Sequence, residues 1–262
     1  MIYEPYKRFI EKRLTIVNKD RQEVPFTLNP IQRRFVEQAG NKEIILKARQ
    51  QGFSSFVLAS FTADFLLKEN TTSVVIADIA DNAKDLLARV KYYLASYETV
   101  KGVKVPLKYN SKYELENAAN HSRYIIGTSE NAQFGRSKTV HNLHMSEAAF
   151  YPHFRDLLAS AGTALVPDGR AVIETTANGF NDFKTFWDES VLGETGFSPR
   201  FYKASDFYPA EFLEGEKKRL GRLFDQEYPE TPESAFITSG STYFDTDAMR
   251  HYLEAVTSVA TI

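Results

Sequence analysis

The residues whose types and spacing point most directly to chemistry lie in segment 47–55, which reads Lys-Ala-Arg-Gln-Gln-Gly-Phe-Ser-Ser. Phosphate-binding loops of the Walker A pattern read G-x-x-x-x-G-K-[ST] between a strand and a helix. Gly52 and Ser54 keep their places in this pattern, whereas Lys47 replaces the first glycine and Phe53 replaces the lysine. Backbone N–H groups at such a loop and helix N-terminus converge on one point, which suits a polyphosphate.

The positive charge that position 53 lacks is available from Lys47 or Arg49 at the other end of the loop. Apolar runs at 44–46 and 56–67 flank the loop and predict a strand before it and a helix after it. An ordinary strand-to-helix turn with basic residues explains the loop alone equally well. The residues predicted to bind the nucleotide here are Lys47, Ala48, Arg49, Gln50, Gln51, Gly52, Phe53, Ser54 and Ser55.

Glu147 follows a strand-like run at 139–145, where a carboxylate can accept a hydrogen bond from a water in line with a γ-phosphate. Ser146 occupies the neighbouring position, where a metal-binding aspartate is usual. A hydroxyl binds Mg²⁺ more weakly than a carboxylate, so Ser54, the phosphates and waters are expected to hold most of the metal. The alternative for Glu147 is a carboxylate that offsets a helix dipole, which the nearby phosphate loop makes the weaker interpretation.

Two further segments could act on a bound phosphate. Thr175, Thr176 and Asn178 follow an apolar strand-like run and could sense the γ-phosphate, although an ordinary strand exit into an Asn-Gly turn explains them better when they are taken alone. Arg136 precedes the strand that leads to the acidic residue. It could stabilise charge on phosphate in the transition state, although a solvated arginine is the commoner case for a loop.

Asn29 and Gln32 stand at the start of a predicted helix. Asn29 suits the N-cap, Pro30 suits the first helical position, and Gln32 stands where a capping box places its glutamine. The functional alternative is that Gln32 reads an adenine while Phe26 or a neighbouring ring stacks on the base. The sequence leaves both roles open.

The order of the predicted elements indicates an α/β fold with a mostly parallel sheet flanked by helices. A helical run at 83–97 lies among the predicted strands. These strands are 44–47, 73–77, 123–128, 139–145 and 171–175. Parallel sheets bind ligands at the carboxyl ends of their strands, and Lys47, Ser146 and Thr175 all fall at such ends.

Composition excludes several classes of site. The 262 residues carry a formal net charge of −2 and no cysteine, so we expect neither disulfides, nor cysteine-ligated zinc, nor a broadly basic surface. There is no signal-peptide core and no apolar run long enough to span a membrane, which indicates a cytosolic protein. His141 and His144 are three apart on a strand and face opposite sides, which disfavours a shared metal.

Any nucleic-acid surface must therefore be local. Basic residues with interleaved tyrosines between positions 101 and 113 could track phosphates without reading sequence. A solvated charged face is the slightly better explanation, because Glu114 and Glu116 follow closely. The candidates for DNA contact are Lys101, Lys104, Lys108, Tyr109, Lys112 and Tyr113.

Taken together and in this order, the segments resemble the ATPase domain of a large terminase, the DNA-packaging motor subunit of tailed bacteriophages. The resemblance rests on segments 29–32, 47–55, 145–150, 175–179 and 228–236. It implies a P-loop NTPase fold (RecA/ASCE-like). Because the strand and helix pattern weakens into Pro-, Glu- and aromatic-rich sequence after about residue 200, we expect an ATPase core over residues 1–200 and a small lid or linker subdomain over residues 201–262. The nuclease domain that such proteins normally carry is expected to be absent from this chain.

The resemblance also implies roles for single residues. The positions that match catalytic residues are Lys47, Arg49, Glu147 and Arg136, the last presented to the ATP of a neighbouring subunit. The position that matches an adenine-contacting residue is Gln32. The positions that match the motif coupling hydrolysis to movement are Thr175, Thr176 and Asn178. The positions on the Mg²⁺ side are Ser54 and, weakly, Ser146, and the departures from the family pattern are Phe53 and Ser146.

The cofactors implied by the resemblance are ATP and Mg²⁺, and the polymer that is moved is double-stranded DNA. Several copies would form a ring, a pentamer by analogy with the family, docked on the portal protein of an empty capsid. The small terminase subunit is a further expected partner. Such a protein works in the host cell cytoplasm and needs no membrane.

Two other functions fit part of the pattern. A helicase-like ATPase acting on DNA or RNA shares the loop, the acidic strand end and the glutamine. It needs a second RecA-like lobe, for which we expect no room in this chain. A nucleotide-binding docking module with little hydrolysis is suggested by Phe53 and Ser146.

Overall fold

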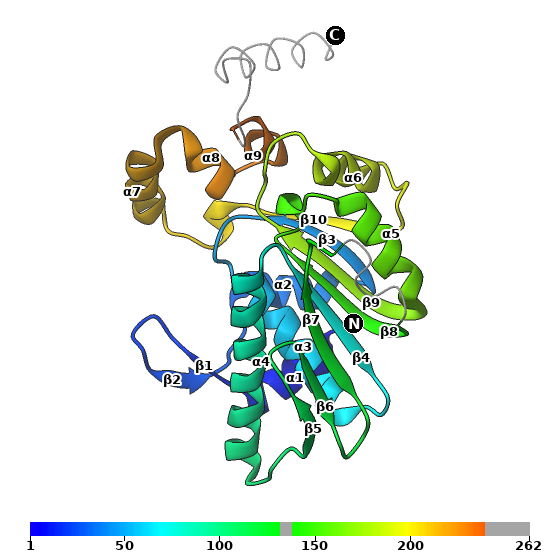
Figure 1. Ribbon diagram of the computed structural model, residues 1–262. Helices are drawn as coiled ribbons and strands as arrows, with labels where there is room; N and C mark the ends of the chain where they lie inside the picture. The colour runs from blue at the N-terminus through cyan, green and yellow to red at the C-terminus, as the bar shows by residue number, and fades with distance from the viewer. Residues whose placement is uncertain (132–137, 239–262) are drawn as a thin grey trace.

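The structure, a computed structural model, describes residues 1–131 and 138–238. Its centre is an eight-stranded sheet in the order β10-β3-β9-β8-β4-β7-β6-β5 (Figure 1). The strands from β10 to β7 are parallel, and β6 and β5 continue the sheet antiparallel. The strand bounds are β3 Lys42–Lys47, β4 Thr72–Ala77, β5 Leu107–Asn110, β6 Glu114–Asn117, β7 Arg123–Thr128, β8 Val140–Ser146, β9 Leu165–Thr175 and β10 Ser198–Tyr202.

Helices cover the sheet, and a separate two-stranded hairpin, β1 (Thr15–Val17) with β2 (Glu23–Pro25), lies beside it. The α-helices are α1 Glu4–Arg13, α2 Pro30–Gln38, α3 Phe53–Leu67, α4 Ala80–Lys101, α5 Phe154–Ala164, α6 Asp182–Val191, α7 Ala210–Leu220, α8 Phe224–Glu227 and α9 Pro232–Thr238. The short 3₁₀ helices are η1 Ala148–Phe150, η2 Ala204–Asp206 and η3 Gly221–Leu223.

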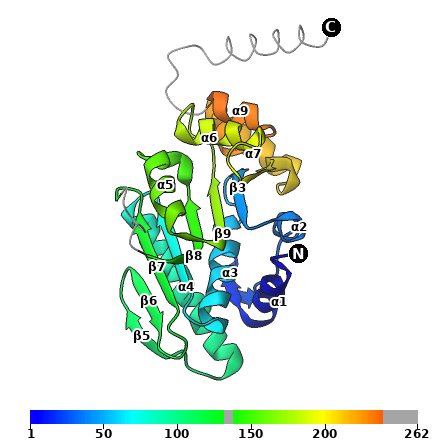
Figure 2. The same cartoon turned by 90° about the vertical axis from the view of Figure 1, so that its right-hand side faces the viewer.

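The sheet is buried on both faces, so its central strands must be apolar throughout. Successive side chains of a strand point to opposite faces, and this divides the core in two. Ile45 and Val75 pack with residues of α1, α2, α3 and α4, whereas Ile44 and Val74 pack with residues of α5, α6 and α9. Figure 2 shows α5 and α3 on opposite sides of β9. The polar residues of interest are thus left at the strand ends.

Helix α3 is apolar on nearly every side, which is the pattern of a helix buried all round. It packs against the sheet on one side and against α1 and α4 on the others. Its first turn follows segment 48–52 directly, so the core position of the helix fixes the phosphate-loop candidate and Ser54 in space. Loop and core therefore form one rigid unit.

The chain after β10 lies over the carboxyl end of β3. Backbone N–H groups of the loop donate to this segment, from Ala48 to the Tyr202 carbonyl at 3.2 Å and from Arg49 to the Glu227 carbonyl at 2.9 Å. Ala48 also packs against Tyr208 and Tyr228. In Figure 1, α7, α8 and α9 lie together at this end of the molecule. The predicted division at residue 200 stays a prediction.

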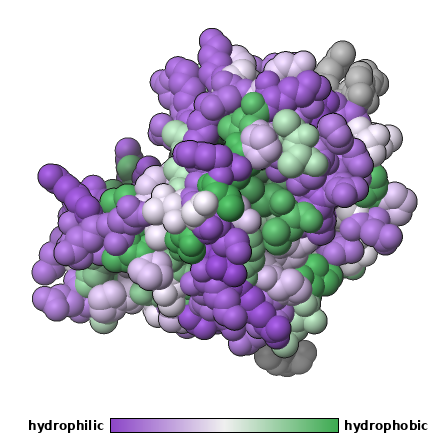
Figure 3. All heavy atoms as spheres, turned by 90° about the horizontal axis from the view of Figure 1, so that it is seen from below, coloured by the Kyte–Doolittle hydropathy of each residue, from purple (hydrophilic) through white to green (hydrophobic). Residues whose placement is uncertain are grey.

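The predicted strands and the helix at 83–97 are confirmed, but the strand predicted at 171–175 begins six residues earlier, at Leu165, and the other ends differ by at most four residues. The sequence analysis missed β5, β6, β10 and the hairpin. Seen from the end opposite to α7–α9, Figure 3 shows a central group of hydrophobic residues with hydrophilic residues around it. Within residues 1–131 and 138–238, no helix is long and apolar enough to cross a membrane.

Candidate active site

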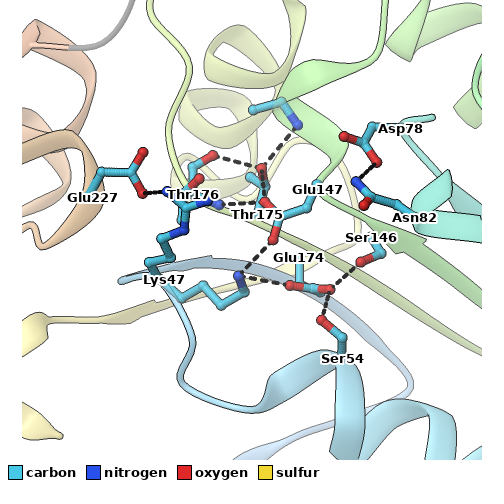
Figure 4. A network of polar contacts seen from close by, with 12 residues as sticks. Lys47, Ser54, Asp78, Asn82, Ser146, Glu147, Glu174, Thr175, Thr176 and Glu227 are labelled. Atoms are coloured by element: carbon cyan, nitrogen blue, oxygen red, sulfur yellow. Dashed lines mark hydrogen bonds and ion pairs between the residues drawn. The ribbon is translucent and has the colours of Figure 1, made fainter. Parts of the chain in front are cut away.

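The carboxyl ends of four neighbouring parallel strands carry polar residues, and the sequence singled out three of them, Lys47, Ser146 and Thr175. Lys47 ends β3, Thr175 ends β9, Ser146 ends β8, and Asp78 follows β4. The segment that follows β10, here called the C-terminal segment, adds Glu227, the last residue of α8. Figure 4 shows these side chains gathered around the strand ends. Chain segments far apart in sequence thus meet at the edge where parallel sheets place their ligands.

Lys47 lies between two carboxylates. Its Nζ is 3.2 Å from Glu147 Oε1 and 3.1 Å from Glu174 Oε2, and only 4% of its side chain is exposed. Burial lowers the pKa of the Lys47 ammonium, but the charges of Glu147 and Glu174 raise it by more than burial lowers it. The pKa therefore lies above its ordinary value. The ammonium therefore stays charged at the strand end.

Glu147 reaches the same point from β8. Its backbone has φ 59°, a left-handed conformation that is uncommon for a non-glycine residue. The carboxylate accepts a hydrogen bond from Thr176 N at 3.3 Å and one from Thr175 Oγ1 at 3.4 Å, and 31% of the side chain is exposed. Burial raises the pKa of Glu147, Lys47 lowers it, and Glu174 raises it, with a net shift upward. A raised pKa suits a carboxylate that accepts a proton.

Glu174 is a site residue that the sequence analysis missed. It is fully buried on β9, and its Oε1 accepts hydrogen bonds from Ser54 Oγ at 2.7 Å and Ser146 Oγ at 2.7 Å. His144 Nε2 lies 3.3 Å from the same oxygen. Burial raises the pKa of Glu174, but Lys47, His144 and Ser146 lower it below its ordinary value, so the group is ionised. The available signal was a lone acidic residue inside an apolar strand.

The loop at 48–52 has the backbone that the motif requires. Gly52 has φ 82° and begins α3, and a Cβ there would lie 2.9 Å from Gln32 Nε2. The left-handed backbone therefore favours glycine, and a Cβ would also displace the Gln32 amide. Gln50 also has positive φ, at 55°. Gln51 is buried and donates from Nε2 to the Lys203 carbonyl at 3.0 Å, which ties the loop to the C-terminal segment.

Phe53, which stands at the usual lysine position, faces the core. It is buried, with its ring 4.6 Å from that of Tyr202 and 5.7 Å from that of Phe35. Arg49 extends toward the C-terminal segment, and its Nη1 lies 3.1 Å from Glu227 Oε2. Of the two basic residues predicted to replace the lysine charge, Lys47 is therefore the one already at the acidic cluster.

Gln32 forms the predicted capping box with Asn29, since each side chain bonds the other's backbone N–H. Its Nε2 also donates to the Gly52 carbonyl at 2.8 Å, and Asn29 Nδ2 donates to the Gln51 carbonyl at 3.0 Å. The cap prediction is confirmed, and the cap also holds the loop. The adenine-contacting role stays a prediction.

Two cavities adjoin the loop. A polar one of about 430 Å³ is bordered among others by Arg49, Ser54, Arg89, Ser146, Glu147 and Thr176. The other, of about 670 Å³, is bordered among others by Phe26, Asn29, Gln32, Gln50, Tyr92 and Phe207. Both touch Asp85 and Arg89, and Arg89 Nη1 donates to Ser55 Oγ at 3.1 Å. A polar space for phosphates next to an aromatic space for a base suits a nucleotide.

The predicted coupling residues lie directly behind Glu147. Thr175 Oγ1 has one proton, and its shorter contact is with the Thr176 carbonyl at 2.6 Å, so the 3.4 Å bond to Glu147 is the alternative to it. Asn178 Nδ2 donates to the carbonyl of Ala149, within η1, at 3.2 Å. The end of β9 and the end of β8 are thus connected through polar side chains. Arg136 lies outside the described residues.

The described residues suit Mg²⁺ only together with phosphates. Ser54 and Ser146 offer hydroxyl oxygens beside an ionised carboxylate, and oxygen is the ligand that Mg²⁺ prefers. Over residues 1–131 and 138–238, no group of three or more His, Cys, Asp or Glu side chains is placed to hold a metal. His141 Nδ1 accepts from Thr72 N at 3.1 Å, whereas His144 contacts Glu174, so the two histidines do not form one site.

The basic candidates for DNA contact lie on and before the β5–β6 hairpin. Lys108 pairs with Glu116 at 2.9 Å and also lies over the Tyr109 ring at 5.2 Å, and Lys112 lies over the Tyr113 ring at 5.1 Å. Both tyrosines are exposed. The hairpin therefore combines exposed rings with cations, one of them offset by an acidic partner.

Comparison with solved structures finds the same fold in phage large terminases. The ATPase domain of the Thermus phage P74-26 large terminase aligns with a TM-score of 0.61 at 17% identity over 76% of this chain and 92% of that chain. The HK97 bacteriophage large terminase aligns with a TM-score of 0.61 at 15% identity over 90% of this chain and 50% of that chain. The large terminase of a thermophilic bacteriophage, in complex with ATP-γ-S, aligns with a TM-score of 0.55 at 10% identity over 72% and 47%, respectively.

No protein-family model matches the chain, and neither does any curated protein. The structural matches show that the chain has the α/β P-loop NTPase fold of large terminase ATPase domains. The predicted fold class is confirmed, and so is the resemblance drawn from the motifs, at the level of the fold. Because sequence identity is low, function has to be argued from the site.

Proposed function

We propose that this chain is the ATP-hydrolysing motor domain of a viral large terminase, which moves double-stranded DNA into a procapsid. The observation that carries the proposal is the contact between Lys47 and Glu147, which are 100 residues apart in sequence and 3.2 Å apart in space beside the polar cavity. A cation and a partly exposed carboxylate beside a phosphate loop suit transfer of a phosphoryl group to water. The shared fold supports the same conclusion.

In this proposal each charged group has one task. The Lys47 ammonium and Arg49 neutralise the phosphates, while Glu147 orients the attacking water and accepts its proton. The phosphates compete with Glu147 for Lys47, and binding therefore frees the carboxylate for the water. Bound Mg²⁺ would polarise the phosphate oxygens as a Lewis acid, held at the hydroxyl side of the site by Ser54 and, weakly, Ser146.

The contacts of Thr175 and Thr176 with the Glu147 carboxylate support a coupling role. A change of partner at Glu147 on hydrolysis alters its hydrogen bonds to Thr176 N and Thr175 Oγ1 and so reaches the end of β9. Asn178 extends the path to η1. We further propose that Arg136 acts on the ATP of a neighbouring subunit, which makes turnover depend on assembly into a ring, expected to be a pentamer.

The remaining partners follow from the same proposal. The adenine occupies the aromatic cavity beside Gln32, whose engaged side chain then serves both the loop and the base. Lys108 and Lys112 with their tyrosines contact the DNA backbone, which predicts binding that weakens with salt. The portal protein and the small terminase subunit are the protein partners, and the host cell cytoplasm is where they meet.

The direct test is an ATPase assay of Glu147→Ala and Lys47→Ala in the presence of Mg²⁺ and DNA. Both variants should lose most of the turnover, since one lacks the group that orients the water and the other lacks the charge on the phosphates. Glu189→Ala is the matched control, because that carboxylate is partly exposed, like Glu147, and pairs with Arg155 away from the cavities. Wild-type turnover in either site variant would refute the assignment of that residue.

A further inference from the structure

Glu174 has a position in the sheet that makes it the neighbour of every group on the metal side of the site. In the register of the sheet it lies opposite Ser146 of β8 and opposite Ile45 of β3. It therefore stands between the strand that carries the phosphate loop and the strand that carries Glu147. Figure 4 shows its carboxylate between Lys47 on one side and the two serine hydroxyls on the other.

The small residue at position 146 and the carboxylate at position 174 are complementary. Position 146 is where an aspartate was expected, and its serine side chain leaves a carboxylate from β9 within 2.7 Å of its Oγ. An aspartate at 146 beside Glu174 would place two negative charges in contact in a buried site, which is strongly unfavourable. The acidic group at this strand end thus comes from the adjacent strand.

The hydrogen bonds of Glu174 determine what the two hydroxyls can do. A serine hydroxyl has one proton and two lone pairs. Ser54 and Ser146 both give their proton to Glu174 Oε1, so their lone pairs remain for a cation. The carboxylate also adds a negative charge directly behind both oxygens.

We propose that Glu174 is the positioning residue for the divalent cation of the site, and that it takes over from β9 the role of the carboxylate missing at position 146. It orients the hydroxyls of Ser54 and Ser146 toward Mg²⁺ bound with the nucleotide and supplies the negative charge behind them. This inference rests on the proposed ATPase function. It adds Glu174 to the residues of the site and explains why a serine, not an aspartate, stands at position 146.

The competing explanation is that Glu174 only balances the buried charge of Lys47, which lies 3.1 Å from its other oxygen. The two explanations differ in what they say about the metal. A counter-ion for Lys47 affects nucleotide binding equally with and without Mg²⁺. A positioning residue for the cation affects the gain in binding that Mg²⁺ brings.

The test measures the affinity of a fluorescent ATP analogue for wild type and Glu174→Gln, with Mg²⁺ and with EDTA, and the affinity for Mn²⁺ in the presence of nucleotide by electron paramagnetic resonance. Glutamine keeps the size of the side chain and removes the charge. Substitutions of groups that support a metal ligand typically cost about 10- to 100-fold in metal affinity. We expect a Mn²⁺ affinity lower by about that factor and a correspondingly smaller gain from Mg²⁺.

Glu43→Gln is the matched control for burial and charge. Glu43 is also fully buried, lies on the neighbouring strand β3, and pairs with Arg200 at 2.8 Å. It borders neither of the two cavities beside the loop. Its substitution should lower stability without changing the ratio of affinities with and without Mg²⁺.

A relocation variant separates the role from simple damage. Ser146→Asp alone should weaken Mg²⁺-dependent binding because it crowds two carboxylates, whereas Ser146→Asp with Glu174→Ser should recover it, since one acidic group again faces Ser54. Thermal unfolding confirms that each variant is folded.

The inference is overturned if folded Glu174→Gln keeps the wild-type affinity for Mn²⁺, or if it loses nucleotide affinity to the same extent with Mg²⁺ and with EDTA. Lack of recovery in the relocation variant, with both single variants folded, also counts against it. A wild-type protein that binds no ATP would instead refute the proposed function itself. The two failures are therefore distinguishable.

Discussion

This fold contains two buried clusters of charged side chains. In both clusters the charges are paired, but the clusters differ in their access to a cavity. The first joins Lys47, Glu147 and Glu174 at the carboxyl ends of the strands. The second lies under α1, where Arg170 Nη2 contacts Asp64 Oδ2 at 2.7 Å. A buried charge needs a partner, and both clusters provide one. Only the first also borders a polar cavity, through Glu147.

The second cluster is closed by aromatic rings and amides. The Arg170 guanidinium lies 4.0 Å from the centre of the Tyr6 ring, and its Nε donates to Asn142 Oδ1 at 3.0 Å. Asp64 also accepts hydrogen bonds from Tyr6 and Asn142, and its Oδ1 pairs with Lys68 Nζ at 3.0 Å. The carboxylate is thus fully paired, and the cluster fastens α1 to the sheet.

The first cluster has two carboxylates for one ammonium. This excess of negative charge is costly in a buried site unless something positive completes it. One of the carboxylates is partly exposed to the cavity, where a cation and a phosphate can enter. The comparison teaches that a cluster with excess negative charge beside a cavity indicates function, whereas one whose carboxylate is fully paired indicates stability.

The largest effect should come from Glu147→Gln. Glutamine keeps the hydrogen bond from Thr176 N but cannot accept a proton from water, and loss of a general base typically costs about 10²–10⁴-fold in rate. Phosphate release should fall by that factor while the fluorescent ATP analogue still binds. Glu189→Gln, on the partly exposed pair with Arg155, should turn over like wild type. If turnover of Glu147→Gln is unchanged, the role of this cluster in catalysis is wrong.

Arg170→Met should have the opposite effect, with lower stability and unchanged turnover of the folded protein. The change removes the buried partner of Asp64 and leaves the exposed Lys68, 3.0 Å from its other oxygen, as the remaining cation, and breaking a buried pair costs up to about 3–5 kcal/mol of stability. Urea unfolding followed by the fluorescence of Trp187, the single tryptophan and a buried one, measures this loss. The fraction that remains folded should hydrolyse ATP at the wild-type rate. A stable variant with reduced turnover would contradict the division between the two clusters.

The central strands and their functional ends could be predicted because burial on both faces forces long apolar runs that stop where polar residues begin. Lys47 and Ser146 were found in this way. The short strand β10, Ser198–Tyr202, was missed because it contains a proline and an arginine and is held mainly by pairing with β3. Local sequence says little about such a strand, since its partner decides its conformation.

Glu174 was missed for a related reason. Its meaning depends on the register between β8 and β9, which places it opposite Ser146, and that register comes from tertiary packing. The sequence shows only one acidic residue between the apolar run 171–173 and the two threonines that follow. Gln32 shows the converse, because its structural role was read correctly from the capping box while its contact with Gly52 was not foreseen.

Removal of the metal should change the stability of the protein by less than the Arg170 substitution does, and it should act only through the cluster of Lys47, Glu147 and Glu174. At about 100 times its dissociation constant, a ligand stabilises the folded state by about 2.7 kcal/mol. ATP analogue with Mg²⁺ should therefore raise the unfolding midpoint of wild type, and EDTA should remove most of this gain. Folded Arg170→Met protein should show the same gain from a lower starting point. Equal stabilisation with Mg²⁺ and with EDTA would show that the cluster of Lys47, Glu147 and Glu174 does not bind nucleotide through a metal.

The smallest effect concerns the cap that holds the loop. Asn29→Ala removes the N-cap of α2 and should cost about 1 kcal/mol of stability. Asn181→Ala is its match for nucleotide binding, because Asn181 is the N-cap of α6 and accepts from Lys184 N at 3.2 Å. Its Nδ2 donates to the Ala149 and Asn178 carbonyls and not to the loop. Asn29 also donates to the Gln51 carbonyl, so its loss should weaken nucleotide binding as well, which the α6 variant should not do. Equal stability losses with equal nucleotide affinities would show that the loop keeps its shape without this bond.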